Sequence, residues 1–458
     1  MIISFAQTLL ATKECIESSS TKQYLDSVTI IRDVHGQISL FIEPHKDVPN
    51  DKEIWTDLQN QLSSKLGAYY SGNTWISGTQ NASELLITLI QEERISATWN
   101  QENTQPHWYI LERRIAKEVW TAAGTGNPPW PVEAVDRGEK PAVVSFFSYK
   151  GGVGRTTALA ATALTLARYG HRVAMIDMDL EAPGLATLFS PESDGPQATK
   201  LGVLDYLLEK PIHDSSWSVR PHVQTITDQT LLGDAGEPLR LLPAGVVDED
   251  YLEKLARIDF QHIVDKQLDE RLCEMLNEIA QIGGSFDFIF LDARAGFHDL
   301  GGVAVANLAH AAVVIGNHSR QTWAGLTHVI WRLARPLAKQ DEELPVILVQ
   351  AMAAPQSRPG ANLERQAFRE KAEDIFYNNY YTLSEAGMVN VSHETPPHIP
   401  VVVEWSELLQ GDIVLFARDE TPEEAARLAW LVSSLTTGSY EELAERICHL
   451  FGKKLIRK

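Results

Sequence analysis

The sequence predicts an α/β protein in which a small α+β domain precedes a doubly wound domain built on a mostly parallel sheet. Three observations support this prediction. A chain of 458 residues is longer than one ordinary domain. A run rich in proline and glycine divides it at residues 121–140. After that run, short apolar segments alternate with helical patterns, which is typical of parallel strands covered by helices on both faces.

The amino-terminal part, residues 1–120, mixes helical and strand patterns. Its predicted elements are an opening helix through Phe5, Leu9 and Ile16, a β-hairpin of residues 28–33 and 37–44, a helix with Ile54, Leu58, Leu62 and Leu66 on one face, a helix over 81–93, and a strand over 107–115. No catalytic constellation stands out in this part. It is therefore either an interaction or sensing module or a structural appendage, and the sequence leaves both interpretations open.

Residues 121–140 are predicted to be a linker. Gly124, Gly126, Pro128, Pro129 and Pro131 fall within it. Proline removes backbone donors and glycine frees the backbone, so a regular element across the whole run is not expected. We place the second domain at residues 141–438.

The second domain begins a strand–loop–helix rhythm. Its expected strands are residues 143–149, 171–179, 239–243, 286–293, 310–316 and 345–352. In sheets of this kind, ligands bind at the carboxyl ends of the strands. Candidate site residues are therefore sought where these strands end.

A glycine-rich loop follows the first of these strands. Residues 150–157 read KGGVGRTT, and a helical pattern continues from there. Glycines let backbone N–H groups turn toward anionic oxygens, and the N-terminus of the following helix adds partial positive charge. The Thr156 hydroxyl is placed to ligate Mg²⁺, although Arg155 stands where the usual phosphate-loop pattern has lysine. The order of strand, loop and helix predicts a nucleotide phosphate site.

Acidic residues end two further strands. Asp177 and Asp179 project on one face because strand side chains alternate with a period of two, and Asp292 follows four apolar residues. Carboxylates at these positions suit phosphoryl transfer, where catalysis is largely positioning and charge neutralisation.

The glycine-rich loop over residues 150–157 resembles the deviant Walker A loop of the MinD/ParA group of P-loop ATPases. That group usually has KGGVGKTT, and residues 150–157 resemble its arginine variant in particular. Residues 173–185 resemble the group's switch I segment, and residues 286–296 resemble its Walker B strand and switch II. The resemblance covers residues 142–400, whereas residues 1–138 resemble no family that we can name.

The resemblance implies ATP and Mg²⁺ as ligands. Lys150 would have a catalytic role by reaching the nucleotide of the partner subunit in an ATP-dependent homodimer, and Asp179 would position the attacking water. Thr156, Asp292 and Asp177 are the implied metal residues. The implied phosphate cradle is Lys150, Gly151, Gly152, Val153, Gly154, Arg155, Thr156 and Thr157.

Two departures from the group's pattern bear on chemistry. Arg155 is planar and permanently charged, so it still contacts phosphate oxygens but occupies a different point from lysine. The run from Asp292 to Gly296 lacks the usual proline and adds Arg294. Arg294 either stabilises transferring phosphate or forms a surface ion pair.

Base recognition is predicted from the same group, in which a strand-end amide and a later proline segment hold adenine. Gln350 ends the run VILVQ over 346–350, and the run His398-Ile399-Pro400 lies downstream. An amide side chain offers both a donor and an acceptor to a base edge, but it also serves as a strand cap. Residues 317–321 form a further candidate loop near the nucleotide.

Charge and composition limit the partners. Hydrophobic residues make up 44% of the chain, and 40 basic against 61 acidic residues give a formal net charge of −21. DNA binding is disfavoured because a DNA-coating protein needs a basic surplus. Cys15, Cys273 and Cys448 form no CxxC pair, no secretory leader is recognised and no apolar run reaches about 18 residues, so we expect a cytoplasmic protein.

The carboxyl-terminal residues 439–458 are predicted to be a basic amphipathic tail. Leu450, Phe451 and Leu455 alternate there with Lys453 and Lys454. Such a segment either contacts an anionic membrane surface peripherally, as the tails of MinD-type proteins do, or packs on its own domain.

The expected function is an ATP-dependent, dimerising molecular switch with slow ATP hydrolysis that regulates an unidentified protein partner. Family resemblance alone suggests a bacterial regulatory or phage-defence system. Two alternatives remain, a nucleotide-sensing scaffold that does not hydrolyse ATP and a DNA-partition ATPase.

Overall fold

A computed structural model describes residues 3–45, 52–78, 83–101, 104–114, 116–121, 128–189, 201–213, 217–258, 267–334, 343–381, 395–409, 411 and 413–456. These residues form two compact units, Met1–Ile115 and Ala116–Lys458. No helix among the described residues is long and apolar enough to cross a membrane.

The amino-terminal unit is a five-stranded mixed sheet with helices on both faces. Its elements are η1 Phe5–Gln7, α1 Thr8–Ser18, η2 Ser20–Tyr24, β1 Leu25–Arg32, β2 Ile38–Pro44, α2 Lys52–Leu66, η3 Gly67–Tyr69, β3 Tyr70–Ile76, α3 Glu84–Glu93, β4 Ile95–Ser96 and β5 His107–Glu112. The strand order is β3-β2-β1-β5-β4. The predicted hairpin is confirmed, since β1 and β2 pair antiparallel, with Ile30 opposite Leu40.

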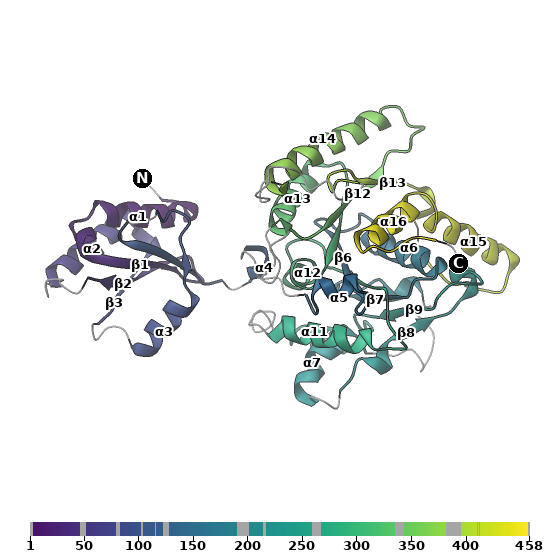
Figure 1. Cartoon of the computed structure of the whole chain (residues 1–458), viewed down its shortest axis with the longest axis horizontal. Helices are drawn as coiled ribbons and strands as arrows, with labels where there is room; N and C mark the ends of the chain where they lie inside the picture. The colour runs from purple at the N-terminus through teal and green to yellow at the C-terminus, as the bar shows by residue number, and fades with distance from the viewer. Residues whose placement is uncertain are drawn as a thin grey trace. The chain divides into compact units, whose positions relative to one another are not determined.

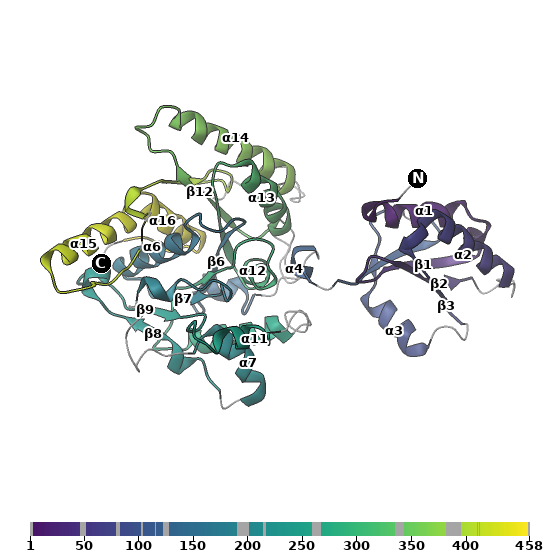
Figure 2. The same cartoon turned by 180° about the vertical axis from the view of Figure 1, so that it is seen from behind.

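Alternation along the strands of this unit builds two small cores. Ile16 of α1 and Leu62 of α2 pack with Ile30 on one face, whereas Ile90 of α3 packs with Phe41 on the other. Figure 2 shows α1 and α2 on one side of the sheet and α3 on the opposite side. The unit is therefore an α+β layer structure with its own interior.

The larger unit contains the eight-stranded sheet. Its elements are α4 Glu118–Thr121, α5 Val132–Asp136, β6 Ala142–Ser148, α6 Arg155–Arg168, β7 Val173–Asp177, η4 Ala186–Leu188, α7 Val203–His213, η6 Arg220–His222, β8 Gln224–Ile226, α8 Gln229–Leu232, β9 Leu239–Leu242, α9 Tyr251–Leu255, α11 Gln267–Ala280, β10 Phe288–Asp292, α12 Asp299–Gly302, the π-helix η7 Val303–Asn307, β11 Ala311–Gly316, α13 Arg320–Leu333, β12 Val346–Ala353, α14 Ala361–Asn379, β13 Val401–Glu404, η9 Glu407–Leu409, α15 Pro422–Leu435 and α16 Ser439–Leu450 (Figure 1). The six strands predicted after the linker are all confirmed.

The sheet is doubly wound and mostly parallel, as predicted. Its strand order is β13-β12-β11-β6-β10-β7-β9-β8, and β8 alone among the described strands of this sheet pairs antiparallel. The first strand in the chain, β6, lies between β10 and β11, so the chain winds outward in both directions from it. The carboxyl end of β6 is thus a topological switch point, where ligands of such sheets bind.

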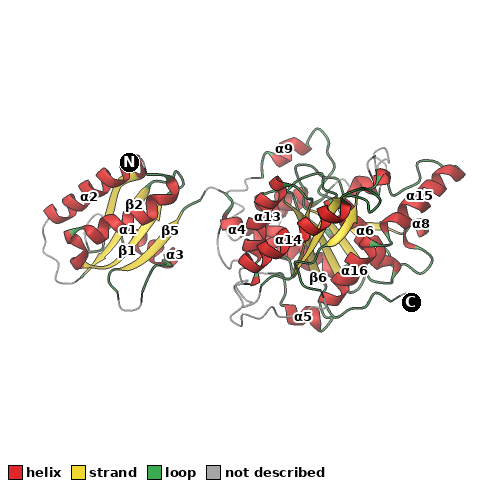
Figure 3. Cartoon of the chain, turned by 90° about the horizontal axis from the view of Figure 1, so that it is seen from above, coloured by secondary structure: helices red, strands yellow, loops and turns green. Residues whose placement is uncertain are grey.

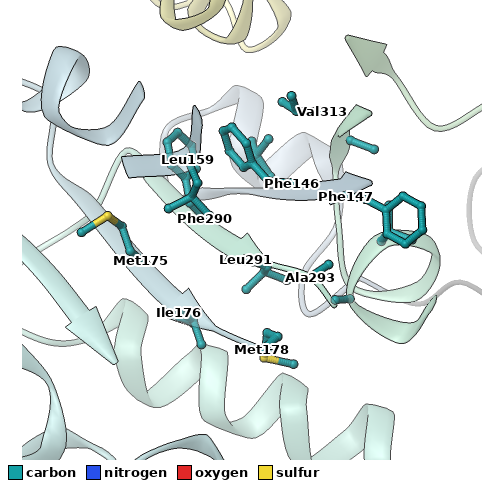
Figure 4. Packing of buried hydrophobic residues seen from close by; sticks show 14 of the residues in the cluster. Phe146, Phe147, Leu159, Met175, Ile176, Met178, Phe290, Leu291, Ala293 and Val313 are labelled. Atoms are coloured by element: carbon teal, nitrogen blue, oxygen red, sulfur yellow. The ribbon is translucent and has the colours of Figure 1, made fainter. Parts of the chain in front are cut away.

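Helices cover both faces of this sheet. Helix α6 packs on β6, β7, β9 and β10 and is itself covered by α15 and α16, while α13 and α14 pack on β11 and β12 (Figure 3). Consecutive residues of β6 serve the two faces. Phe146 lies beside Leu159 of α6 and Phe290 of β10 (Figure 4), whereas the Phe147 ring lies 5.3 Å from that of Trp120. Every strand in the middle of the sheet is therefore apolar along its length.

The second half of the expected linker belongs to the core of the larger unit. Residues 122–127 lie outside the described part of the chain, but Trp130 is 5% exposed and Val135 of α5 is 2% exposed. The Trp130 indole donates to the Pro141 carbonyl over 2.8 Å. Residues 128–140 thus form a packed turn and helix, because two large apolar side chains find a long-range partner that local composition does not reveal.

The expected tail is likewise part of this unit. Its residues up to Leu450 form α16, in which Leu443, Ile447 and Cys448 are fully buried against α6. Lys453 pairs with Asp287 at 2.7 Å. The apolar face of the amphipathic segment is therefore used in packing, while Arg457 and Lys458 lie outside the described residues.

A buried histidine links these packed residues to the sheet. His310, 2% exposed, accepts from the Val143 amide through Nδ1 and lies 2.9 Å from the Trp130 carbonyl through Nε2. The two bonds require the neutral tautomer that carries its proton on Nε2. Burial lowers the pKa of His310 to about 4.

This histidine predicts a pH-dependent stability. Above pH 6.5 the ring is neutral in both states, but below it the unfolded chain takes up a proton that the folded chain refuses, so stability falls as the pH drops. Between pH 7.5 and 5 we expect a loss of about 2 kcal/mol in the free energy of unfolding from this residue. His310→Gln, whose amide offers an acceptor and a donor but does not titrate in this range, should lack this component. Denaturant titrations at both pH values measure it, and parallel pH profiles for the two proteins would contradict it.

Candidate functional site

The glycine-rich loop joins β6 to α6 at the switch point of the sheet. Gly152 and Gly154 have φ angles of +74° and +82°, and Gly154 is the N-cap residue of α6. Left-handed backbone favours glycine at these two positions. A Cβ atom built on either would meet nothing within 4 Å, so the space above the loop is open. Val153 between them is buried and anchors the loop.

Three acidic residues gather beside this loop, as predicted. Asp177 ends β7 and Asp292 ends β10, and the two are register partners in adjacent parallel strands. Asp179 follows two residues after Asp177. All three side chains are buried, with Asp177 and Asp292 at 0% and 1% exposure. Such a cluster needs cations or donors to offset its charge.

Arg155, the first residue of α6, supplies one of those cations. Its Nε donates to Asp292 Oδ1 over 2.5 Å, and its Nη2 donates to Asp179 Oδ2 over 3.1 Å. Burial disfavours its charge, but Asp292 and Asp179 outweigh burial and raise the pKa of Arg155. The guanidinium that was predicted to bind phosphate is thus bound to two carboxylates. It can contact a phosphate group only if it moves away from them.

Thr156 and Asp292 form an oxygen pair suited to a hard metal ion. The Thr156 hydroxyl donates to Asp292 Oδ2 over 2.6 Å. Burial raises the pKa of Asp292 in spite of Arg155. The described residues contain no group of three or more acidic, histidine or cysteine side chains that could hold a metal. This pair fits Mg²⁺, which takes one or two protein oxygens and completes its shell with water and substrate phosphate.

Asp177, the third predicted metal residue, is occupied by backbone donors. Its Oδ1 accepts from the Asp179 amide, and its Oδ2 accepts from the amides of Gly184 and Leu185 at 3.0–3.1 Å. Burial, with a smaller contribution from Asp292, raises its pKa to about 7. Asp177 therefore shapes the loop over residues 177–185, and its oxygens face that loop.

Asp179 stands at the centre of an ion-pair network. Besides Arg155, it accepts from Arg294 Nη1 over 2.6 Å through Oδ1. Arg294 also pairs with Glu181 at 2.6 Å, and His298 Nε2 lies 2.8 Å from the same carboxylate. Both interpretations of Arg294 are thus relevant, since it is an ion-pair residue that lies one contact from the predicted catalytic acid. Sequence reasoning missed Glu181 and His298. Glu181 lies in the segment 173–185 but had no role assigned there, and His298 lies outside every motif.

Lys150 lies at the mouth of the loop and donates to Gln321 at the start of α13. The candidate loop over residues 317–321 is therefore next to the predicted catalytic lysine. Among the described residues Lys150 has no carboxylate partner within ion-pair distance. Its ammonium group remains available to an anion.

A pocket of about 290 Å³ opens beside the glycine loop. Its lining residues are Gly152, Val153, Gly154, Thr157, Ala158, Ile315, Val349, Ala351, Met352, Val403, Glu404, Trp405, Ser406, Leu409 and Tyr440. Its lining combines apolar side chains, such as Ile315 and Val349, with polar groups, such as Thr157 and Ser406, as nucleoside pockets do. Of the predicted phosphate residues, Gly152, Val153, Gly154 and Thr157 border it.

The two predicted base-binding residues do not line this pocket. Val349 lines it, and strand alternation turns the next residue, Gln350, to the other face of the sheet. Gln350 is 0% exposed, and within the described part of the chain its amide atoms have no hydrogen-bond partner. Pro400 is buried one residue before β13. Sequence reasoning missed Trp405, which β13 delivers to the pocket and which is 37% exposed.

A glycine loop that caps a helix, with carboxylates at the adjoining strand ends, defines a P-loop-type nucleotide site. Residues 144–373 match the family model described as "CobQ/CobB/MinD/ParA nucleotide binding domain". This chain belongs to that family.

Individual relatives match over shorter stretches. A chloroplastic MinD homologue of Arabidopsis thaliana, a septum site-determining protein, is 48% identical over 56 residues, which is 12% of this chain and 17% of that protein. An uncharacterized ATP-binding protein of Methanocaldococcus jannaschii is 28% identical over 156 residues, or 34% and 46%. An uncharacterized protein of Mycobacterium tuberculosis is 27% identical over 173 residues, or 37% and 46%. The chain thus spans less than half the length of these curated relatives.

Two solved structures are similar to this chain at low sequence identity. The pNOB8 ParA structure covers 68% of this chain and 99% of its own, with 16% identity and a TM-score of 0.43. The MinD structure of Pyrococcus horikoshii, complexed with Mg-ADP, covers 68% and 98%, with 17% identity and a TM-score of 0.39.

The buried arginine predicts a measurable coupling. Arg155→Met leaves the buried Asp292 carboxylate without its cation and should lower the free energy of unfolding by about 3 kcal/mol. Adding Asp292→Asn should recover much of this loss, because the uncompensated charge disappears. Arg168→Met, on the same helix, is the control, since that guanidinium donates to the Leu231 carbonyl. Additive effects of the two substitutions in denaturant titrations would show that the pair is not energetically coupled.

Proposed function

We propose that this chain is an ATP-dependent molecular switch that dimerises on nucleotide and hydrolyses it slowly. The observation that carries the proposal is the cluster in which Arg155 and Thr156, the first residues of α6, both contact Asp292. A helix N-terminus with open space above its glycines accepts phosphate oxygens. Directly beside it, Thr156 and Asp292 offer the hard oxygens that a phosphate-bound cation needs.

The cradle residues have distinct roles in this proposal. Backbone N–H groups of residues 151–156 would bind the phosphate chain of ATP, with Thr156 and Asp292 as the residues that hold Mg²⁺. The metal supplies neutralisation of phosphate charge when it is bound. The pocket beside the loop would receive the base, with the half-exposed Trp405 ring as a stacking surface and Val349 at its base.

Nucleotide binding would rearrange the charges of the site. A phosphate group competes with Asp292 and Asp179 for the Arg155 guanidinium, because arginine forms strong bidentate bonds with either partner. Moving Arg155 to phosphate would free Asp292 to serve the metal and Asp179 to orient a water molecule. The switch in this proposal is therefore an exchange of ion-pair partners at one buried cation.

A second candidate function has its own support. In the structure both carboxylate oxygens of Asp179 accept from arginines, one from Arg155 and one from Arg294. The Ala182 amide also donates to Asp179 Oδ1, so three acceptor sites of this carboxylate are filled and little capacity remains to orient water. If those bonds persist when ATP is bound, the chain is a nucleotide-sensing scaffold without turnover. A single-turnover assay separates the two, since only the switch releases phosphate.

The proposed function does not include contact with a membrane or with DNA. The apolar residues of α16 are buried against α6, so they are not free to enter a bilayer. The net charge of −21 opposes DNA binding at physiological salt. The regulated partner is therefore proposed to be a protein.

ATP binding tests the cradle directly. Wild-type protein should bind Mg-ATP in calorimetry, and Thr156→Val should weaken this binding about 10-fold or more, because a metal ligand is replaced by a methyl group. Thr165→Val is the matched control, since Thr165 is a buried threonine of α6 whose hydroxyl donates to Ala161 within the helix. Equal affinity of wild type and Thr156→Val for Mg-ATP would overturn the metal assignment. No ATP binding by the wild type would overturn the proposed function.

Assembly tests the role of Lys150. We propose that Lys150 contacts the nucleotide of a second subunit, because Arg155, Thr156 and the backbone already serve its own phosphate site. Sedimentation with a non-hydrolysable ATP analogue should show a dimer for the wild type and a monomer for Lys150→Ala at the same nucleotide occupancy. Lys371→Ala, which removes an exposed lysine of α14, should still dimerise. A Lys150→Ala variant that dimerises like the wild type would leave this residue a local contact of Gln321.

A further inference from the structure

The segment Ala116–Thr121, by which the chain enters the larger unit, lies on the loop that follows Asp292. We call this segment the strap and residues 293–302 the sensor loop. We propose that Lys117 and Trp120 of the strap are positioning residues for Arg294, and that nucleotide state is passed through the sensor loop to the strap. The inference rests on the proposed nucleotide switch and adds a route from its site to the chain that leads to the amino-terminal unit.

Lys117 clamps the far end of the sensor loop. Its backbone amide donates to Asp299 Oδ1 over 2.6 Å, and its Nζ pairs with Asp299 Oδ2 at 2.9 Å. Asp299 is 5% exposed, whereas the Lys117 side chain is 45% exposed, so the bond from the Lys117 amide is better shielded than the ion pair. Lys117 has a φ of +67°, a left-handed conformation that is rare for a residue with a side chain. Backbone held in this way persists where the surroundings over-determine it, and here the two bonds to Asp299 do so.

Trp120 makes the second contact of the strap. Its indole Nε1 donates to the His298 carbonyl over 2.9 Å, and its ring lies 5.2 Å from that of Phe297. A Cβ atom at Gly302 would meet the Trp120 indole at 2.7 Å, so the close approach needs glycine at that position. Trp120 is buried, so the strap contributes a core side chain to its contact with the sensor loop.

The sensor loop is tied on its other side to the phosphate loop. The Gly296 amide donates to the Ser148 carbonyl over 3.1 Å, and the Phe297 ring lies 5.2 Å from that of Tyr149, the residue before Lys150. The loop also closes on itself, because a Cβ atom at Gly301 would meet the Arg294 carbonyl at 2.5 Å. A shift of the Arg294 backbone toward this first turn of α12 therefore requires the turn to move as well.

Charge contacts complete the route. Arg294 pairs with Asp179 and Glu181, and His298 lies against the same Glu181. A phosphate group that draws Arg155 away from Asp179 removes one of the two cations on that carboxylate. The balance of the Arg294 contacts then changes, and Arg294 and Asp299 stand at the two ends of one tightly packed loop. The strap senses this change because it holds the Asp299 end.

Hydrogen exchange of the full chain with and without Mg-ATP tests the route. The peptides that cover 150–157, 293–302 and 116–121 should all change their exchange when nucleotide binds. Change at 150–157 and 293–302 with none at 116–121 would overturn the strap inference and leave the proposed function standing. Absence of change at all three, together with no binding in calorimetry, would overturn both.

Variants test whether the strap acts through Arg294. Lys117→Gly accepts the left-handed backbone and keeps the amide bond while it removes the ion pair, and Trp120→Phe keeps the ring while it removes the bond to His298. Each should lower kcat about 3-fold or more with KM for ATP within 2-fold of wild type, because the cradle is untouched. Lys117→Arg should restore the ion pair and the rate.

The decisive comparison is a double-mutant cycle. In an Arg294→Ala background, Lys117→Gly and Trp120→Phe should have little further effect on kcat, since the residue that they position is gone. Effects that multiply fully with that of Arg294→Ala would show that the strap acts by another path and would overturn the assignment. If the wild type shows no turnover, the same cycle is measured on the nucleotide-induced exchange at 116–121, with the same two outcomes.

Discussion

The buried guanidinium of Arg155 is the interaction on which the upper edge of the large sheet depends. Two carboxylates of adjoining strands, Asp292 and Asp179, share this one cation in a place where water has little access. Asp177 is satisfied by backbone amides instead, so its charge needs no side-chain partner. Removal of Arg155 would leave buried carboxylate charge without this cation, which is why the glycine loop, the helix start and the strand ends depend on one another.

The choice of arginine at this position has a geometric consequence. Its planar fork donates from Nε to one carboxylate and from Nη2 to the other, a fixed arrangement that a lysine ammonium, as a point charge, does not provide. The resting site is therefore held more firmly than a lysine would hold it, and a phosphate ligand must offer at least equal contacts to draw the guanidinium away. In the proposed function this competition favours slow turnover, because the exchange of ion-pair partners would precede any chemistry.

Local patterns were enough to predict much of the fold and of the phosphate loop. The strands after residue 140, the helix from Arg155 and the acidic strand ends follow from periodicity and short-range motifs, which depend on neighbouring residues only. Other features depend on distant partners. Trp130 is packed because its indole finds the Pro141 carbonyl and its own carbonyl faces His310, and α16 is packed because its apolar face meets α6. From composition alone, residues 121–140 are predicted to be a linker and residues 439–458 a tail.

The site shows the same division at the level of single residues. Gln350 stands at the predicted strand end, yet the pleat of β12 turns it to the face opposite the pocket, while β13 supplies Trp405 from outside any motif. Glu181 and His298 enter only because the loop after β7 and the loop after β10 meet above the sheet. Motifs identify the residues that we propose to touch phosphate, whereas the groups that hold those residues come from loops whose meeting is a property of the fold. The control of the proposed switch is therefore to be sought in the loops, where Arg294 and its neighbours lie between the strand-end carboxylates and the strap.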